Sequence, residues 1–143
     1  MYISKSRING QGLFAGQSFH KGDIIIDNLF PHKDIHKTAL GATETIVWEY
    51  RENIEELVQE LSLQGIAICT IEQAEKTLFL QNISELREDK FALIFGNEVN
   101  GVKQTIVDRS NYVIEIPQFG TKHSLNVSVC AGIVLWEFCK KYL

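Results

Sequence analysis

Glycines and polar residues follow an apolar run in the middle of the chain, and their types suit a ligand-binding turn. The run Phe91–Phe95 is followed by Gly96, Asn97 and Glu98, and Gly101 comes shortly after. Gly96 allows the backbone to approach a ligand closely, and Gly101 permits a sharp return of the chain. Asn97 and Glu98 add an amide and a carboxylate to the same turn. Taken alone, a strand followed by a Gly-Asn segment is more often only an ordinary turn, and that alternative stays open.

A second segment with similar features lies about twenty residues further on. The apolar run Tyr112–Ile116 stops at Pro117, and a loop leads to Ser124, Leu125 and Asn126 before the last apolar stretch. Ser124 or Asn126 could simply cap the following helix. Backbone N–H and C=O groups exposed in such a loop could also bind the edge of an adenine ring. Because ligands of open parallel sheets bind beside the carboxyl ends of the strands, both segments are candidate parts of one site.

Strand and helix signals alternate from Pro31 onward, which predicts an α/β domain with a mainly parallel sheet and helices on both faces. Asn53 is the expected N-cap of a helix that Gly65 closes, with Glu56 at the capping-box position. Strands are predicted at 46–50, 66–71, 91–95 and 112–116. Residues 1–30 are rich in glycine and contain the run Ile24–Ile26, which predicts turns and short strands.

The last predicted helix extends from Asn126 to Tyr142 and is apolar nearly all round between Val127 and Cys139. Such a helix is expected to pack against its own sheet and against a further surface. The apolar stretch Cys130–Trp136 is far shorter than the roughly 20 residues of a membrane span. The N-terminal residues also lack the apolar run of a signal peptide. We therefore predict a cytoplasmic protein.

Composition predicts one globular domain, since the chain has 143 residues, 45% of them apolar and 22% charged. The net charge of −4 differs from the basic footprint expected of a nucleic-acid-binding protein. A small cationic cluster nevertheless occurs at residues 32–37. The three cysteines, Cys69, Cys130 and Cys139, form no CxxC pair and lie among apolar neighbours. They are interpreted as buried hydrophobic residues, with no disulfide and no metal site.

The two segments taken together strongly resemble motifs 2 and 3 of the SpoU/TrmH family of RNA 2′-O-ribose methyltransferases, a branch of the SPOUT superfamily. The pair reads Gly96-Asn-Glu-x-x-Gly101 and Ile116-Pro-x-x-Gly, then Ser124-Leu-Asn-Val-Ser-Val. Residues 33–42 also resemble the loop that precedes the middle strands in that family. The resemblance covers residues 31–143. It implies a SPOUT fold with a C-terminal trefoil knot, activity on tRNA or rRNA, and a homodimer formed through the terminal helix.

The resemblance also implies roles for individual residues. S-adenosylmethionine would be held in a bent shape, largely by backbone groups, with Gly96, Ile116 and Leu125 around the adenosine. Asn97 and Glu98 fall on the polar pair of motif 2, and Ser124 and Asn126 on the polar residues of motif 3. The cofactor-binding set is therefore Gly96, Asn97, Ile116, Ser124, Leu125 and Asn126, and the catalytic set is Glu98, Ser124 and Asn126.

One motif of the family is not found. Members carry an early Asn-x-Gly-x-x-x-Arg, whose arginine is expected to help activate the ribose 2′-hydroxyl. No such pattern precedes Pro31. Methyl transfer needs the cofactor and acceptor held in line and a group that takes the proton. Without the arginine, Glu98 or His123 would have to serve as the base, and we expect impaired catalysis. For His123, an ordinary solvent-facing loop residue is the favoured interpretation.

Residues 3–27 instead resemble the opening β-hairpin of a SET domain, in which a Gly-x-Gly turn such as Gly10-Gln-Gly12 touches the cofactor. The later SET motifs are absent. We interpret the chain as a fusion or truncation with two parts, 1–30 and 31–143. The leading hypothesis is an S-adenosylmethionine-dependent RNA 2′-O-ribose methyltransferase. The alternatives are a catalytically silent module for cofactor binding or dimerisation and, less favoured, a SET-type protein-lysine methyltransferase.

Overall fold

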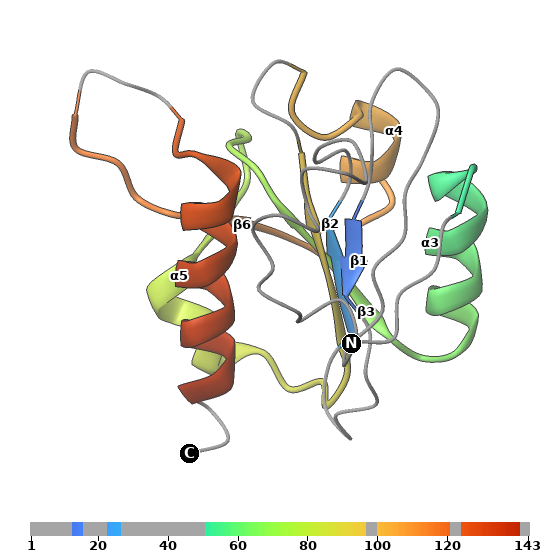
Figure 1. The fold of residues 1–143 in the computed structure, drawn as a ribbon. Helices are drawn as coiled ribbons and strands as arrows, with labels where there is room; N and C mark the ends of the chain where they lie inside the picture. Colours follow the sequence, from blue (N-terminus) through green and yellow to red (C-terminus); the bar gives the residue numbers. More distant parts are fainter. Residues whose placement is uncertain (1–12, 16–22, 27–50, 97–99, 121–123, 141–143) are drawn as a thin grey trace, which may run out of the picture.

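The computed structural model describes residues 13–15, 23–26, 51–96, 100–120 and 124–140. These residues form a six-stranded sheet in the order β1-β2-β5-β3-β6-β4, with helices on both faces (Figure 1). Strands β1 and β2 pair antiparallel, and every other neighbouring pair is parallel. The predicted α/β class with a mainly parallel sheet is therefore confirmed. The strand predicted at 46–50 and the cationic cluster at 32–37 lie outside the described residues.

The elements have the following bounds along the chain: β1 Leu13–Ala15, β2 Asp23–Ile26, α3 Ile54–Leu63, β3 Ala67–Ile71, β4 Leu78–Phe79, the 3-10 helix η1 Leu80–Glu85, β5 Phe91–Phe95, α4 Gln104–Val107, β6 Tyr112–Glu115 and α5 Val127–Lys140. The short strands expected near the N-terminus are confirmed by β1 and β2, and α3, β3, β5, β6 and α5 lie close to their predicted positions. The elements β4, η1 and α4 were not predicted from the sequence. Each is too short to produce a periodic pattern of apolar residues.

The three central strands, β5, β3 and β6, place their carboxyl ends side by side. Ile71 at the end of β3 lies opposite Phe95 of β5 and opposite Ile114 of β6. Every residue of β3 and β5 is buried. Continuous apolar sequences of this kind suit strands covered on both faces, because neither face needs polar residues.

One face of the sheet is covered by α5 and η1. The sheet-facing side of α5 consists of Val127, Ala131, Val134 and Phe138, which recur at the spacing of a helix face. Phe138 packs edge-to-face on Phe91 of β5, with ring centroids 5.3 Å apart. None of the described helices is both long and apolar enough to cross a membrane.

The opposite face is covered by α3 and α4 (Figure 1). The buried side of α3 consists of Ile54, Leu57, Val58 and Leu61. It packs in one core with Ile68, Ala92 and Ile94 of the sheet and with Val102 and Ile106 at α4. Side chains along β3 point alternately into the two cores. Cys69 faces α5, while its neighbour Ile68 faces α3.

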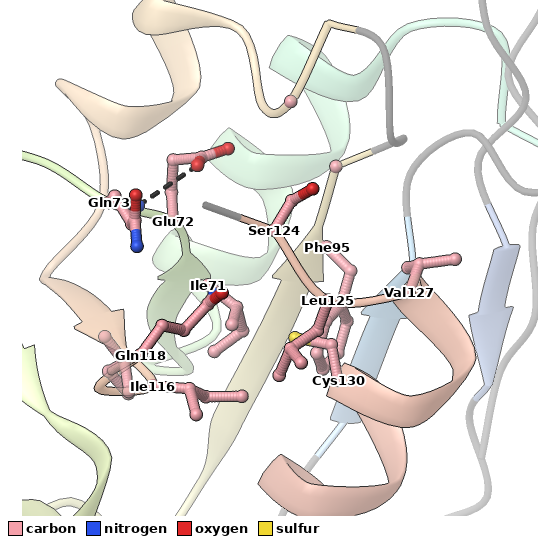
Figure 2. Close-up of a pocket in the computed structure, with 13 residues that line it drawn as sticks. Ile71, Glu72, Gln73, Phe95, Ile116, Gln118, Ser124, Leu125, Val127 and Cys130 are labelled. Carbon is pink, nitrogen blue, oxygen red and sulfur yellow. Dashed lines mark hydrogen bonds between the residues drawn. The ribbon is translucent and has the colours of Figure 1, made fainter. Parts of the chain in front are cut away.

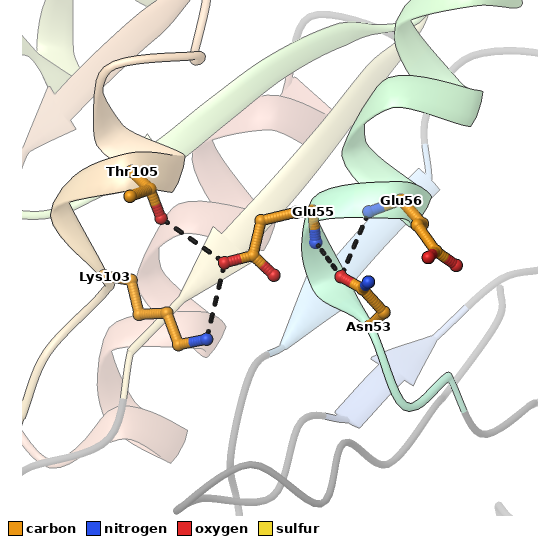
Figure 3. Close-up of polar contacts among 5 residues, drawn as sticks. All are labelled: Asn53, Glu55, Glu56, Lys103 and Thr105. Atoms are coloured by element: carbon orange, nitrogen blue, oxygen red, sulfur yellow. Dashed lines mark hydrogen bonds and ion pairs between the residues drawn. The ribbon is translucent and has the colours of Figure 1, made fainter.

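The start of α3 is fixed by side-chain hydrogen bonds (Figure 3). The Asn53 Oδ1 atom accepts from the backbone N–H groups of Glu55, at 3.0 Å, and Glu56, at 3.3 Å, which confirms the predicted N-cap. Glu55 Oε1 accepts in turn from Lys103 Nζ and Thr105 Oγ1, both at 3.4 Å. These contacts join α3 to the chain that enters α4. After the helix, Gly65 has a φ of 74°, as expected of a closing glycine.

The three cysteines differ in burial. Cys69 in β3 is fully buried, as predicted, and Cys130 in α5 is partly buried. The prediction is wrong for Cys139, which is exposed. Successive helix residues turn by about 100° around the axis. Since Phe138 points to the core, Cys139 lies on a different face of α5.

Candidate functional site

A cavity of about 210 Å³ lies at the carboxyl ends of β5, β3 and β6 (Figure 2). Its apolar floor consists of the last buried side chains of these strands, Phe95, Ile71 and Ile114. The segments that follow the strands supply the rest of the lining: Glu72, Gln73, Gly96, Gly101, Ile116, Gln118, Ser124, Leu125, Val127 and Cys130. The two segments singled out in the sequence therefore come together beside the strand ends, as predicted.

Four of the predicted site residues line this cavity, namely Gly96, Ile116, Ser124 and Leu125. Ile116 and Leu125 are half-buried, whereas Ser124 is exposed. Asn97 and Glu98, together with His123, lie outside the described residues. The individual roles assigned to all these residues stay predictions.

Asn126 lies at the first turn of α5 beside the cavity, and its groups serve the helix. Its Oδ1 atom accepts from the N–H of Ser128 at 3.0 Å, and its carbonyl accepts from the N–H of Cys130 at 2.9 Å. Of the alternatives that the sequence left open, capping is thus observed at Asn126. This cap fixes the point at which α5 leaves the loop, and with it the placement of Leu125 and Val127 on the cavity wall.

The loop after β5 folds tightly onto itself at its two glycines. A Cβ atom on Gly96 would lie 2.2 Å from the carbonyl carbon of Gly101 and 2.5 Å from the nitrogen of Val102. Gly101 has a φ of 60°, a conformation that residues with side chains rarely adopt. The sharp return expected at Gly101 is therefore present. The close approach at Gly96 is made to the chain itself.

Glu72 is a site residue that the sequence analysis missed. One carboxylate oxygen, Oε2, accepts from the Val102 N–H at 3.1 Å, and the other, Oε1, accepts from the Gln73 N–H at 3.0 Å. Its own N–H donates to the carbonyl of Ile114 at 3.1 Å. A usable signal was present, because Glu72 directly follows the buried run 66–71. The rule applied to the residues after the other two strands applies equally to this one.

The cavity wall also holds a thiol. Burial, followed by the negative charge of Glu72, raises the pKa of Cys130 to about 11. The thiol is therefore protonated at neutral pH and behaves as a small apolar group. Together with Val127 and Leu125 it makes the α5 side of the cavity largely apolar.

The arrangement suits a ligand that has an apolar face and polar edges. The floor and the α5 wall are apolar, while Glu72, Gln73, Gln118 and Ser124 place polar groups at the cavity. Gly96 and Gly101 add backbone to the lining. Apolar walls with few oriented polar groups are typical of small-molecule and cofactor sites.

Comparison with known proteins gives consistent results. A model of the SpoU rRNA Methylase family matches residues 18–136. The "23S rRNA (guanosine-2'-O-)-methyltransferase RlmB" of Neisseria meningitidis is 35% identical over 104 residues, which are 72% of this chain and 40% of that protein. A protein of the same description from Ralstonia nicotianae is 31% identical over the same shares of both chains. This chain therefore spans about 40% of the length of these relatives.

Solved structures share the fold. The TrmH/SpoU tRNA modifying enzyme of A. aeolicus superposes with a TM-score of 0.66 at 27% identity, over 73% of this chain and 52% of that chain. An AdoMet-bound rRNA methyltransferase from Sinorhizobium meliloti gives a TM-score of 0.73 at 21% identity, over 86% and 47% of the two chains. The latter likeness concerns the fold alone. From the family match over most of its length and the identity to these relatives, the chain belongs to the SpoU rRNA methylase family.

Proposed function

We propose that this protein is an S-adenosylmethionine-dependent RNA 2′-O-ribose methyltransferase acting on tRNA or rRNA. One observation carries the proposal: the chain segments after β5 and β6 meet in a cavity at the strand ends. Family membership and relatives described as 23S rRNA 2′-O-methyltransferases support it.

The cavity residues fit S-adenosylmethionine. Ile116 and Leu125 offer apolar contact to the faces of an adenine ring, and backbone groups of the loop before α5 are available to its edge. Gly96 and Gly101 contribute backbone to the cavity wall, with the Glu72 carboxylate against Gly101. When bound, the cofactor supplies a methyl group on a positively charged sulfur, which is an electrophile.

The acceptor side is assigned by prediction to Glu98, Ser124 and Asn126. Ser124 is exposed beside the cavity, where its hydroxyl could bind the incoming ribose. Asn126 contributes by holding the first turn of α5, and so the position of Leu125. Glu98 or His123 is proposed to accept the proton of the 2′-hydroxyl.

Two measurements test this function. Calorimetry with S-adenosylhomocysteine should show binding by the folded protein. Incubation with methyl-labelled S-adenosylmethionine and bulk tRNA or rRNA, followed by digestion to nucleosides, should yield 2′-O-methylnucleosides. Absence of S-adenosylhomocysteine binding would count decisively against the proposal. Binding without incorporation would instead support the silent cofactor-binding module.

Ser124→Ala tests both roles proposed for this residue. Loss of the hydroxyl should lower methyl incorporation at least about tenfold, because it is proposed to bind the acceptor ribose, and should also weaken binding of S-adenosylhomocysteine, since Ser124 belongs to the proposed cofactor-binding set. Ser128→Ala is the matched control, since Ser128 is an exposed serine in the next turn that does not line the cavity. An equal loss of incorporation in both variants would contradict the assignment.

We further propose a trefoil knot in the C-terminal half, as in the SPOUT fold. The observed order of β5, β3 and β6, with α5 returning over the face beside the cavity, is compatible with such a path. A crystal structure with continuous density from Phe95 to Val127 is the test. A path in which the chain after β6 does not pass through the loop after β5 would exclude the knot.

The protein is also proposed to form a homodimer through α5. The outward side of this helix carries Val129, Ile133 and Trp136, with exposed fractions of 52%, 39% and 63%. These residues recur at helical spacing and are apolar, so burying them against a second copy would be favourable. The division of the chain into residues 1–30 and 31–143 stays a prediction.

A further inference from the structure

The chain that follows Gly101 is held on one side by contacts with α3 and α4. The side chain of Val102 is buried in the core between the sheet and α3 and α4. Lys103 and Thr105 both contact the Glu55 carboxylate at the start of α3 (Figure 3). These contacts fix Val102 and the residues that follow it. They do not involve Gly101, which is held from the cavity side.

Glu72 supplies that fixation. Its Oε2 atom accepts from the Val102 N–H at 3.1 Å, and a Cβ placed on Gly101 would lie only 2.5 Å from the same oxygen. The carboxylate therefore lies directly against the Cα atom of Gly101, in space that only a glycine leaves open. The second oxygen is held by the Gln73 N–H, which fixes the orientation of the carboxylate (Figure 2).

The backbone of Glu72 is fixed as well. Its N–H donates to the carbonyl of Ile114 in β6, so the residue is held at the end of the central strands. One residue thus connects the end of β3, the end of β6 and the loop after β5. All three segments line the cavity. Hydrogen bonds to an ionised group are stronger than neutral ones, which suits a carboxylate in this place.

We propose that Glu72 is a positioning residue of the cofactor cavity, whose carboxylate holds Gly101 and Val102 against Gly96 by binding the Val102 N–H. This inference rests on the proposed cofactor site. Glu72 acts through the backbone of Gly96 and Gly101, which lines the cavity proposed to bind S-adenosylmethionine. Loss of the carboxylate releases Gly101 and Val102 from this position and weakens cofactor binding.

Two variants test how the effect depends on the number of acceptor oxygens that remain at position 72. Glu72→Ala removes both acceptors, whereas Glu72→Gln keeps one oxygen that can still bind Val102. Glu75→Ala is the matched control, because it removes an exposed glutamate three positions along in the same loop. Far-UV circular dichroism and thermal unfolding establish that each variant folds.

The first readout needs no cofactor. Amide hydrogen exchange at Val102, measured by NMR on the free protein, should be accelerated about tenfold or more in Glu72→Ala. It should be accelerated less in Glu72→Gln and unchanged in Glu75→Ala. Unchanged exchange at Val102 in a folded Glu72→Ala protein would overturn the proposal.

The second readout is the affinity for S-adenosylhomocysteine, which should fall in the same order and by about tenfold in Glu72→Ala. Faster exchange at Val102 with unchanged affinity would also overturn the positioning role. If the unaltered protein binds no S-adenosylhomocysteine, the proposed function fails. The measurement of hydrogen exchange at Val102 then still tests whether Glu72 holds this backbone. Failure of the proposed function and failure of the inference about Glu72 are therefore distinguishable.

Discussion

At the scale of single residues, the loop beside the cavity depends on glycine, because a side chain would not fit between its backbone segments. The glycine turn has no room for a methyl group at Gly96, because the backbone of Gly101 and Val102 already fills that space. Backbone cannot yield as a flexible side chain can. A substitution there must shift the loop, and with it one wall of the site.

Gly96→Ala should therefore lower the affinity for S-adenosylhomocysteine by at least tenfold, roughly the effect of 1.4 kcal/mol, and should also lower the unfolding midpoint. Gly132→Ala is the control for affinity, since a Cβ at Gly132 meets nothing within 4 Å and the residue does not line the cavity. Calorimetry and urea unfolding measure the two effects. Equal affinities for both variants would show that the tight contact at Gly96 is unimportant for binding.

The Cys130 thiol provides a pH-dependent probe of the same cavity. Burial and then the charge of Glu72 raise its pKa to about 11, so the reactive thiolate is scarce at neutral pH. Alkylation of Cys130 by iodoacetamide should rise about tenfold per pH unit between pH 8 and 10. Glu72→Gln removes the negative charge and lowers this pKa, which should speed alkylation at a fixed pH.

Mass spectrometry of the peptide that carries Cys130 measures its alkylation rate separately from that of Cys139, and S-adenosylhomocysteine should slow the reaction. A rate that is flat between pH 8 and 10 would contradict the raised pKa. Glu75→Gln serves as the charge control, because it removes an exposed carboxylate that does not line the cavity.

Residue patterns revealed part of this site. Gly96 and Ser124 were found because a glycine and a polar residue after buried runs are visible in the sequence, whereas Ile116 and Leu125 were assigned from the family resemblance. The contact of Glu72 with Val102 joins residues 30 positions apart. It exists because β3 lies between β5 and β6, and no local pattern encodes that order.

At the scale of elements, α3 shows why local signals can be read reliably. Its N-cap and its spaced apolar residues all belong to the helix or its flanking residues, so the helix could be predicted without knowledge of the tertiary structure. The strands β3, β5 and β6 were likewise visible as buried runs. The elements β4, η1 and α4 owe their form to packing against neighbours, which the sequence pattern does not display.

Removal of the α3 cap is expected to destabilise the protein measurably. Asn53→Ala leaves the N–H groups of Glu55 and Glu56 without their side-chain acceptor, at a cost of about 1 kcal/mol. Asn53→Asp should retain most of the stability, because aspartate caps equally well. Urea unfolding gives the free energies. A cost for Asn53→Asp as large as that for Asn53→Ala would show that capping is not the cause.

At the scale of the whole molecule, the strand order was the hardest feature to foresee. The pairing of β2 with β5 and of β3 with β6 joins distant parts of the chain. The meeting of the two loops was expected from the rule that ligands of parallel sheets bind beside the carboxyl ends of the strands, and the family resemblance supported it. The outward face of α5 follows from composition alone, since a helix that is apolar nearly all round buries only one side on its own sheet.

Trp136→Glu should convert the proposed dimer into a monomer with little change in the fold. Trp136 is 63% exposed in the single chain, and surface substitutions usually change stability by less than about 0.5 kcal/mol. Leu63→Glu is the control, because Leu63 is 81% exposed at the end of α3 on the opposite face of the sheet. Sedimentation velocity measures the mass of each variant. A monomeric unaltered protein, or a dimeric Trp136→Glu variant, would contradict the proposed interface.

The first turns of α5 belong to two surfaces at once. Val127 and Cys130 form the cavity wall, while Val129 and Ile133 face outward between and beyond them. In the proposed dimer, a shift of this helix on ligand binding would also move the surface that contacts the second copy. Thermodynamic reciprocity then requires that S-adenosylhomocysteine change the association constant of the two copies by the same factor by which association changes the affinity for S-adenosylhomocysteine.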